Sequence, residues 1–547
     1  MKASVLKIHP KDNVLVALTN LKKGEVIEHN GNSYTLVDDV NAKHKFFIDD
    51  MKAGDAVYMY GVLVGKTQFD VSRGGRMTTE NTKHATGAYD YRGVKYEWHA
   101  PDVSKFKNRT FNGYHRSDGR VGTANYWLFI PMVFCENRNL DVIREALHNE
   151  LGYAVTDKYK SYTRQLVKAC KEGSDLGGFQ IGDIKPDPLQ QRIFKNIDGI
   201  KFLNHQGGCG GTRQDAETLG RLLAAYCDNP NVGGVTVLSL GCQNLQVKDF
   251  LKYLNERNPG FDKPLHVFEQ QRAQSEEKLV ADAIRKTFEG LIELNKLERK
   301  PAPLTELCIG VKCGGSDGFS GISANPAVGY CADLVVGLGG KILLAEFPEL
   351  CGAEQELVDR SVDEATARKF MRLMRDYNEM AEKVGSGFHM NPSPGNIRDG
   401  LITDAIKSTG AAKKGGTSPV VDVLDYTEKV SKPGLSLVCT PGNDVEATTG
   451  KTASGATLIL FTTGLGTPTG NPVCPTIKVA TNSSLAKRMP DIIDIDTGAI
   501  IEGESTIEEM GEEILEYCIR AASGEEIPKA VQLNQDDFIP WKRGVSL

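Results

Sequence analysis

The sequence predicts an α/β protein in which a small all-β domain at the N-terminus precedes a larger α/β region. Two patterns support this prediction. In residues 1–90, short apolar stretches alternate with turn residues, which is typical of a small antiparallel β domain. From Tyr126 onward, apolar runs alternate with segments in which apolar residues recur at three- and four-residue steps, which indicates strands alternating with helices.

The length of the chain indicates several domains, because its 547 residues exceed the roughly 250–300 at which one hydrophobic core stops growing. We expect a small all-β domain over 1–95, a linker over 96–115, and an α/β region in two parts, 116–385 and 386–547. The stretch Ser408–Gly416 is rich in Gly, Lys and Ala, so we expect a mobile loop or a domain junction there.

The strands and helices of the α/β region are expected where the apolar pattern is clearest. The strand candidates are Tyr126–Phe134, Lys201–Leu203, Val232–Leu240, Glu306–Lys312, Lys341–Phe347, Ser436–Val438 and Thr457–Thr462. Helices are expected over Gln214–Tyr226, Ser275–Lys300 and Glu354–Val384.

The composition argues against several classes of function. The net charge is −6 with Lys and Arg interspersed among acidic residues, so we expect no nucleic-acid partner. Twelve cysteines are too sparse for a disulfide scaffold, which favours reduced thiols in the cytoplasm. The first residues lack the apolar core of a signal peptide, and no apolar run approaches the ~18 residues of a membrane span. We expect a cytoplasmic protein without membrane partners, with a homodimer as the default assembly.

Two phosphate-binding motifs are absent despite partial matches. Gly450-Lys451-Thr452 has the end of a P-loop, but Val445 stands where the motif needs its first glycine. The glycines in Gly464–Gly470 do not have the spacing of a dinucleotide-binding fingerprint. Kinase and NAD-dependent dehydrogenase functions are therefore disfavoured.

Six loops that are rich in glycine and polar residues directly follow predicted strands. They are Asn204–Gly211, Gly241–Asn244, Cys313–Asp317, Pro348–Glu354, Pro441–Asp444 and Gly464–Pro468. A single glycine cluster is most simply a tight turn. Because ligands of open α/β sheets bind beyond the carboxyl ends of the strands, six such loops together predict a binding site.

Candidate metal ligands occur in three of these loops. Cys209, Cys242 and Cys313 follow three different strands, and His205 shares the loop of Cys209. If the loops converge, three thiolates and an imidazole face one cavity, and this ligand set suits iron or zinc. The alternative is that the cysteines are small apolar residues that fit crowded turns.

Carboxylates and backbone amides supply further candidates. The acidic side chains near the strand ends are Asp317, Glu346, Glu349, Glu354 and Asp444. They can serve as acids or bases, metal ligands or acceptors for sugar hydroxyls, and structural salt bridges are the alternative. Gly210 and Gly211 precede a predicted helix whose free N–H groups can hold a substrate carboxylate.

Strings along essentially the whole chain resemble the altronate and galactarate dehydratase family. Those similar to its N-terminal SAF domain, a β-clip module, are Ile8-His9, Asp12-Asn13-Val14, His44-Lys45 and Tyr60-Gly61. Those similar to its catalytic part include Gly241–Asn244, Cys313–Gly318, Ala324-Asn325-Pro326, Asn391–Asn396, Lys414–Pro419, Pro441–Asp444, Phe461–Gly464 and Ala480–Ser483.

The resemblance implies dehydration of a sugar acid, foremost D-altronate to 2-keto-3-deoxy-D-gluconate, with Fe²⁺ or Mn²⁺ as activator. Such a reaction needs a base for the proton next to the carboxylate, positive charge to stabilise the enediolate, and an acid for the leaving hydroxyl. The candidates for acid and base are His44, His205, Asp317 and Glu349; those for substrate binding are Gly210, Gly211, Ser316, Asn325, Asn443, Asp444 and Lys478; those for the metal are Cys209, Cys242 and Cys313.

The chain departs from the family pattern where reactive side chains are common. A His-x-His-x-His-Asn run is replaced by Arg76–Asn81, a Cys by Ala411, and two arginines by Ala124 and Leu465. An apolar Leu cannot replace a bidentate Arg, so another cation such as Arg213 or Lys478 supplies the charge, or the acid is a differently shaped one. Galactarate, a sulfonated acid and a non-catalytic sugar-acid binding role therefore remain as alternatives.

Overall fold

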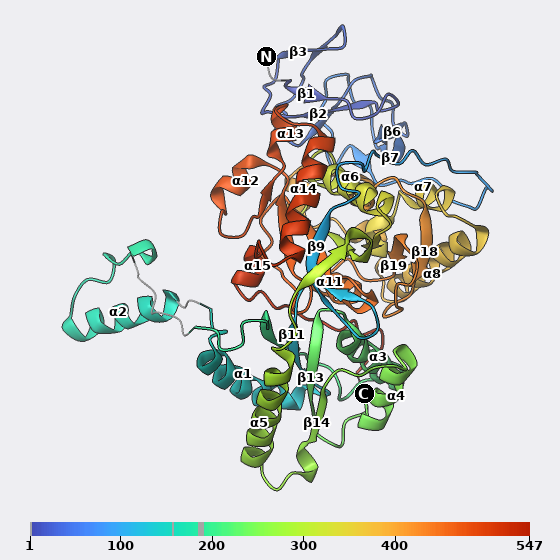
Figure 1. Ribbon diagram of the computed structural model, residues 1–547. Helices are drawn as coiled ribbons and strands as arrows, with labels where there is room; N and C mark the ends of the chain where they lie inside the picture. Colours follow the sequence, from blue (N-terminus) through green and yellow to red (C-terminus); the bar gives the residue numbers. More distant parts are fainter. Residues whose placement is uncertain (1–2, 156–157, 184–190, 547) are drawn as a thin grey trace.

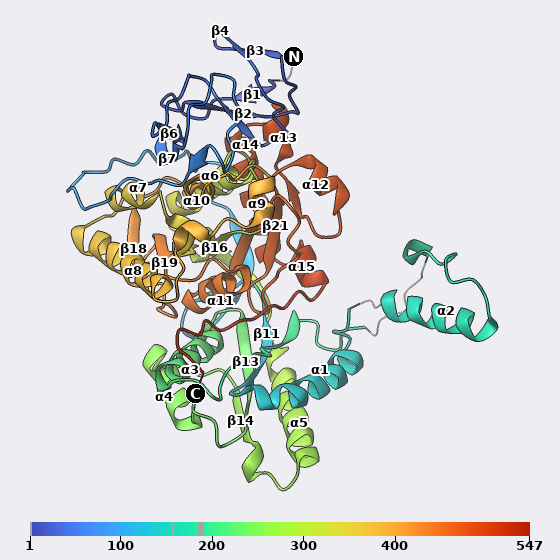
Figure 2. The same cartoon turned by 180° about the vertical axis from the view of Figure 1, so that it is seen from behind.

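The computed structural model describes residues 3–155, 158–183 and 191–546 (Figure 1). The N-terminal β domain lies at one end of the molecule, the largest sheet in the middle, and a smaller parallel sheet at the other end (Figures 1 and 2). The C-terminal segment returns to the smaller sheet, where Arg543 N–H donates to Asp215 Oδ1 at 3.1 Å. None of the helices in the described ranges is long and apolar enough to cross a membrane.

The N-terminal domain consists of short antiparallel strands. One sheet contains β1 (Val5–Leu6), β2 (Val14–Ala17) and β5 (Lys45–Phe47), a second contains β6 (Ala56–Met59), β7 (Val62–Thr67) and β8 (Thr82–Lys83), and β3 (Val26–His29) pairs with β4 (Asn32–Thr35). Two hairpins turn through Asn30-Gly31, with φ of 50° and 79°, and Tyr60-Gly61, with φ of 59° and 79°. Paired positive φ values are what a type I′ turn requires, so these dipeptides set the strand register.

A small antiparallel sheet joins the two larger parts of the molecule. Its strands are β10 (Val121–Gly122), β9 (Thr110–His115) and β15 (Lys300–Pro303), in that order. The predicted linker over 96–115 therefore needs correction, because its last residues form β9. β9 pairs with a strand nearly two hundred residues later, a non-local contact that single-sequence periodicity does not reveal.

The smaller parallel sheet has the order β12 (Gly199–Phe202), β11 (Tyr126–Pro131), β13 (Val232–Ser239), β14 (Leu265–Glu269). Its helices are α1 (Asn137–Leu151), α3 (Arg213–Asp228), α4 (Val247–Arg257) and α5 (Glu276–Leu294), while α2 (Lys158–Glu172) projects away from the body (Figure 1). Trp127 is fully buried against Gly234 and Gly290, where an added Cβ would lie 2.3 and 2.1 Å from the indole ring. These glycines let α5 approach the sheet.

The larger sheet has seven parallel strands. Their order is β18 (Val420–Leu424), β19 (Gly434–Val438), β17 (Lys341–Ala345), β16 (Cys308–Cys313), β20 (Leu458–Thr463), β21 (Thr476–Ala480), β22 (Ile495–Asp496). β16, β20 and β21 are buried along their whole length, as expected where helices cover both faces of a parallel sheet.

The remaining helices belong to this larger part. They are α6 (Ala324–Gly337), α7 (Glu354–Asp359), α8 (Glu364–Glu382), α9 (Pro394–Arg398), α10 (Asp404–Ala412), α11 (Asp444–Ser454), α12 (Ser483–Arg488), α13 (Gly498–Glu502), α14 (Ile507–Ala522) and α15 (Lys529–Gln532). Two 3₁₀ turns, η5 (Phe347–Leu350) and η7 (Lys413–Gly415), border the site described below.

The predicted fold class and all seven strand candidates are confirmed, within a few residues at their ends. The helix expected over Glu354–Val384 is two helices, because Asp363 caps a new start by accepting from Thr366 N–H at 2.7 Å. The seven-stranded sheet takes strands from both sides of residue 385, so the predicted division there does not separate two sheets.

The stretch Ser408–Gly416 is neither a loop nor a junction. It forms the end of α10 and η7 and is almost entirely buried. Its small residues serve close packing, since an added Cβ on Gly410 would lie 3.1 Å from the hydroxyl of Tyr60 and 3.2 Å from Cα of Gly321. The small side chains of this stretch therefore serve close packing, and the predicted mobility is wrong.

Candidate active site

A polar cavity of about 440 Å³ opens at the carboxyl end of the seven-stranded sheet. Its walls come from loops that follow β16, β17, β19 and β20, from the segment before α9, and from α10. The lining residues are Cys313, Gly314, Gly315, Ser316, Glu349, Asn391, Ser393, Asn396, Lys407, Gly442, Asn443, Asp444 and Leu465. The position agrees with the rule that open α/β sheets bind ligands beyond the ends of their strands.

A buried carboxylate surrounded by lysines lies behind the lining of the cavity, next to Asp444. Glu346 is fully buried and pairs directly with Lys312, while Lys414 and Lys451 lie 3.4 and 3.6 Å from its other oxygen. Burial alone would raise the pKa of Glu346, but the three ammonium groups hold it well below its usual value. Glu346 also has φ of 74°, a strained value for a residue other than glycine, and such strain is concentrated at functional sites.

Lysines outnumber carboxylates in this cluster. Lys312 also pairs with Asp444 at 2.8 Å, and Lys407 pairs with Glu349 at 3.0 Å. In the described part of the chain the cluster holds the lysines Lys312, Lys407, Lys414, Lys451 and Lys478 against the carboxylates Glu346, Glu349 and Asp444. A site with this surplus stabilises an anionic substrate, and still more an enediolate.

Two of these lysines are kept partly neutral by their surroundings. Burial lowers the pKa of both Lys451 and Lys478 to about 7. Lys478 donates to the carbonyl of Thr469, and its ammonium lies 3.4 Å from the centre of the Phe461 ring. Lys478, predicted to bind substrate, therefore lies behind the wall of the cavity and acts on it through charge.

Glu349 is the predicted catalytic residue that lines the cavity. One of its oxygens pairs with Lys407, and the other is buried and has no hydrogen-bond partner among the described residues. Lys407 is also bonded to the side chain of Asn391. Burial opposes the charge of Lys407, yet Glu349 keeps the pKa of the lysine above its usual value. Glu349 thus offers a free carboxylate oxygen beside a firmly held cation.

Ser316, Asn443 and Asp444, predicted to bind substrate, also line the cavity. Asn443 caps α11 by accepting from the N–H groups of Val445 and Glu446, so the start of this helix faces the cavity. Asn325 lies one layer deeper, where its Nδ2 is 3.6 Å from Cys313 Sγ and its Oδ1 accepts from Thr462 Oγ1 at 2.6 Å. Asn325 therefore orients Cys313 and does not face the cavity.

Asp317 forms a salt bridge with the N-terminal domain. Its fully buried carboxylate lies 3.0 Å from Lys43 Nζ and accepts from the hydroxyls of Thr481 and Ser320 at 3.0–3.1 Å. Lys43 comes from the β domain and also pairs with Asp399 at 3.0 Å. The predicted catalytic role is not what this geometry favours, because both oxygens are occupied by permanent partners.

His44 also joins the two domains. Its Nε2 is 2.9 Å from the carbonyl of Arg398, and burial lowers the pKa of its imidazole. The neighbouring Lys45 is fully buried and donates to Gly400 O at 2.7 Å. Since His44 lies outside the lining of the cavity, the structure does not bring it to the acid–base position that the sequence suggested.

His205 lies on the other sheet. It lines a separate cavity of about 490 Å³ with Cys209, Gly211 and the C-terminal segment around Phe538. Its Nδ1 accepts from Gly207 N–H at 3.0 Å and its Nε2 is 2.8 Å from Pro131 O, while burial lowers its pKa to about 4. Both ring nitrogens are therefore engaged, and His44 and His205 do not share a site.

The helix start after Gly210 and Gly211 is already occupied. Thr212 and Asp215 form a capping box at the start of α3, and Asp215 also accepts from backbone N–H groups of the C-terminal segment. An acidic side chain at this place repels a substrate carboxylate. The predicted anion site at these glycines is therefore not supported.

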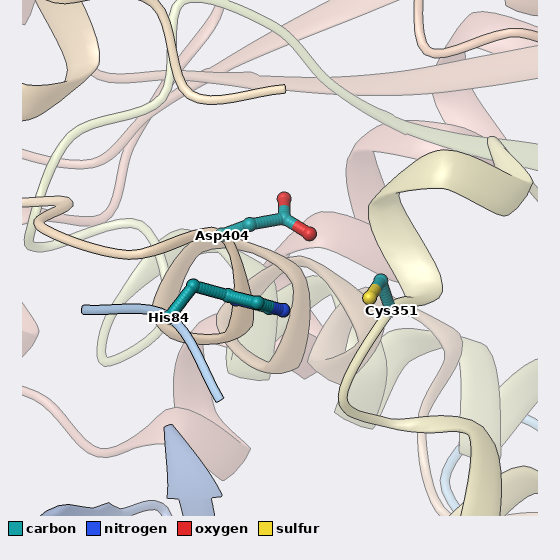
Figure 3. A group of neighbouring side chains, drawn as sticks. All are labelled: His84, Cys351 and Asp404. Atoms are coloured by element: carbon teal, nitrogen blue, oxygen red, sulfur yellow. The ribbon is translucent and has the colours of Figure 1, made fainter. Parts of the chain in front are cut away.

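The predicted three-cysteine metal site does not form. Cys209 and Cys242 follow β12 and β13 of the smaller sheet, whereas Cys313 ends β16 of the larger sheet. Each cysteine follows a strand, but the three strands belong to two different sheets. The sequence alone does not show which strands share a sheet. Among the described residues, one group brings metal-ligating atoms within 4.8 Å of one another, namely His84, Cys351 and Asp404 (Figure 3).

The His84, Cys351 and Asp404 group fits a divalent metal ion. It combines an imidazole, a thiol and a carboxylate, the donors that suit ferrous or zinc ions. Asp404 is buried, and its Oδ2 has no hydrogen-bond partner in the described ranges. A buried unpartnered carboxylate oxygen is costly, so a cation at this position would stabilise it.

The sequence missed the buried lysines and this group. Lys312 interrupts an apolar strand and Lys451 a helix of small residues, and buried lysines of this kind are functional candidates in principle. Nothing in one sequence reveals that Lys312, Lys414 and Lys451 meet at Glu346, because they come from three distant segments.

Comparison with known proteins agrees with the location of the site. The chain matches the family descriptions "Altronate/galactarate dehydratase SAF domain" over residues 3–85, "D-galactarate dehydratase/Altronate hydrolase, second domain" over 113–295, and "D-galactarate/Altronate dehydratase, C-terminal" over 304–546. The cavity and its lysines lie in the last of these, and the boundary between the last two falls between the two parallel sheets.

Relatives that are similar over nearly the full length of the chain are dehydratases of sugar acids. The altronate dehydratase of Bacillus subtilis (strain 168) is 34% identical over 549 residues, covering 100% of both chains. The altronate dehydratase of Escherichia coli (strain K12) is 33% identical over 522 residues, 95% of each chain, and the galactarate dehydratase (L-threo-forming) of the same strain is 30% identical over 528 residues, 95% of this chain and 93% of the relative. The chain therefore belongs to the altronate/galactarate dehydratase family, whose members are sugar-acid hydro-lyases.

Proposed function

We propose that the chain dehydrates a hexonate, D-altronate before other acids, to 2-keto-3-deoxy-D-gluconate with the help of a bound divalent metal ion. The observation that carries this proposal is the surplus of buried lysines around a cavity lined by Glu349, whose second carboxylate oxygen has no hydrogen-bond partner among the described residues. The full-length similarity to two altronate dehydratases supports the choice of acid.

In the proposed reaction the lysines stabilise the charge that develops on the substrate. Lys407 lines the cavity and attracts the carboxylate of the sugar acid, while the buried Lys312 acts from behind the lining through its pair with Asp444. As the C2–H bond breaks, negative charge moves onto this carboxylate and forms an enediolate. Fixed ammonium groups inside a partly dry site stabilise that charge much more strongly than water does.

Glu349 is the proposed base. Its unpartnered oxygen accepts the C2 proton, a C2=C3 double bond forms, and the C3–O bond breaks. The proton goes on to the leaving hydroxyl, so one water molecule departs and the remaining enol becomes the 2-keto acid. Proton transfer by a positioned carboxylate typically contributes ~10²–10⁴-fold to the rate.

An Fe²⁺ ion would add positive charge beside this site. His84, Cys351 and Asp404 would hold it, since they are the described residues whose donor atoms meet. Asp404 lies on α10, the helix that also carries Lys407.

Leu465 favours an acid with one carboxylate. It lines the cavity where the family pattern has an arginine. An aldarate such as galactarate carries a second carboxylate that needs a cation, and an apolar side chain cannot supply one. Altronate, with a hydroxymethyl group at the far end, needs no second cation and is compatible with Leu465.

The experiment is keto-acid release from altronate, galactarate, other hexonates and sulfolactate by anaerobically purified protein, with and without added ferrous or manganous ion. We expect metal-stimulated release from altronate and at least ~10-fold less from galactarate. Release from none of these acids, despite measurable binding, would contradict the proposal and favour a non-catalytic sugar-acid binding role.

A further inference from the structure

Three segments from two domains meet at one group of metal-ligating side chains (Figure 3). His84 directly follows β8 of the N-terminal domain, Cys351 follows η5, and Asp404 is the first residue of α10. One ligand atom from each of them lies within 4.8 Å of the other two. The side chains point toward one another from opposite sides of the domain boundary.

Each side chain of the group is prepared for a cation. His84 offers an imidazole nitrogen, Cys351 a sulfur and Asp404 a carboxylate oxygen within reach of one ion. Asp404 accepts from Ser408 Oγ at 3.2 Å with one oxygen, and the other oxygen is buried without a partner in the described part of the chain. Glu354 lies beside Cys351 and offers a further carboxylate.

The group lies next to the candidate active site but not in its lining. Asp404 and Lys407 are one turn apart on α10, and Cys351 follows Glu349 by two residues. Lys407 and Glu349 in turn form the ion pair in the cavity. An ion held by Cys351 and Asp404 therefore fixes the distance between the two segments that carry this pair.

His84 adds the N-terminal domain to this arrangement. The imidazole contacts the start of α10, where Ala405 N–H donates to Nδ1 at 3.3 Å. This hydrogen bond is long, so it is easily exchanged for a metal bond. The segment after His84, the described residues 86–109, contains no helix or strand. His84 therefore lies at the end of the β domain, directly before this irregular segment.

We propose that His84, Cys351 and Asp404 bind one transition-metal ion, ferrous or zinc, that holds the N-terminal domain against α10 and η5. One sulfur, one nitrogen and one oxygen donor favour these ions over magnesium or calcium, which prefer oxygen alone. Metal binding itself does not depend on the proposed function. The effect of the ion on the Lys407–Glu349 pair rests on the proposed function. For that reaction His84, Cys351 and Asp404 are positioning residues.

The first test uses cobalt(II) as a probe on the full-length protein after metal removal by a chelator. We expect one bound cobalt ion with thiolate-to-cobalt charge-transfer absorption in the near ultraviolet. Cys351→Ser should abolish this absorption, and His84→Ala and Asp404→Asn should each weaken binding at least ~10-fold, because even changes outside the first ligand shell cost that much. Circular dichroism without metal checks that each variant folds.

Matched controls and a competing site make the result decisive. Cys170→Ser and His99→Ala change exposed residues elsewhere and should leave the spectrum unchanged. The exposed cysteines Cys135, Cys209 and Cys242 follow neighbouring strands of the smaller sheet, so a variant with all three changed to Ser is the second arm. Absorption that survives Cys351→Ser but disappears in this triple variant would overturn the proposal.

The second test asks whether the ion joins the domains. Hydrogen exchange of the backbone around β8 and at the start of α10 should slow when zinc is added to the wild-type protein, and should not change in His84→Ala. Equal protection in both proteins would show that the ion does not tie down the N-terminal domain. Neither test uses a substrate, so a failure of the proposed dehydration would leave these results intact.

Discussion

At the scale of single residues, the sequence identified some of the side chains that line the cavity and assigned others to it wrongly. Glu349, Ser316, Asn443 and Asp444 were predicted and line the cavity, because they follow strands of one sheet. His205 was assigned to the same site from its loop alone, yet its strand belongs to the other sheet.

Glu349→Gln tests the proposed base. The amide keeps the size of the side chain but cannot accept the C2 proton, so kcat should fall ~10²–10⁴-fold while KM changes little. Losing the carboxylate also lowers the pKa of Lys407, because Glu349 is what raises it. Steady-state kinetics across pH measures both effects. Glu356→Gln, an exposed partner of Arg360, is the control, and equal losses in both variants would exclude the role.

Leu465→Arg tests the preference for an acid with one carboxylate. An arginine in the cavity wall can pair with a second carboxylate, and a charge-assisted hydrogen bond contributes ~1.5–3 kcal/mol. The ratio of kcat/KM for galactarate to that for altronate should rise ~10-fold or more. The exposed change Leu533→Arg should leave this ratio unchanged. An unaltered ratio in Leu465→Arg would remove Leu465 as a determinant of specificity.

At the scale of elements, strands were predictable and the function of small residues was not. The apolar runs of β11, β13, β16 and β20 are strong signals, since buried parallel strands are continuously apolar. The small residues of α10 serve close contact with Tyr60 and Gly321, and composition alone cannot distinguish such packing from flexibility.

Gly314→Ala tests the close approach between the β16 loop and α11. An added Cβ would lie 2.5 Å from the Phe461 ring and 2.6 Å from the carboxylate of Asp444, so both must move. Overpacking of this kind costs ~1–3 kcal/mol, and the displaced Asp444 should also lower kcat/KM. Thermal unfolding and kinetics measure the two effects. Gly87→Ala, which meets nothing within 4 Å, is the control, and a Gly314→Ala protein with wild-type melting and kinetics would contradict the packing argument.

At the scale of the whole molecule, the N-terminal domain is joined to the catalytic part by a shared apolar cluster and by polar contacts. Lys43 reaches Asp317 and Asp399, Lys45 donates to Gly400 O, and His84 contacts α10. The sequence predicted an N-terminal β domain before a larger α/β region but gave no sign of these contacts, because the residues in each pair are separated by hundreds of positions.

Lys43→Met tests whether the ion pairs of Lys43 hold the N-terminal domain against the catalytic part. Asp317 is fully buried, and removing its cation leaves an uncompensated charge, which typically costs ~3–5 kcal/mol. The N-terminal domain should detach more often, so limited proteolysis should cut the segment 86–109 at least ~10-fold faster. Lys52→Met breaks an exposed pair with Asp70 and should have little effect. Cleavage at the wild-type rate in Lys43→Met would show that Lys43 does not hold the domain.

The central claim is that the cavity lined by Glu349 and Lys407 removes water from a hexonate through an enediolate. Its most direct test is turnover of D-altronate in deuterium oxide, with the product examined by nuclear magnetic resonance. The account predicts a 2-keto-3-deoxy acid with one solvent deuterium at C3, because the enol left by water loss takes its new proton from solvent. Unchanged altronate, or a product without deuterium at C3, would contradict it.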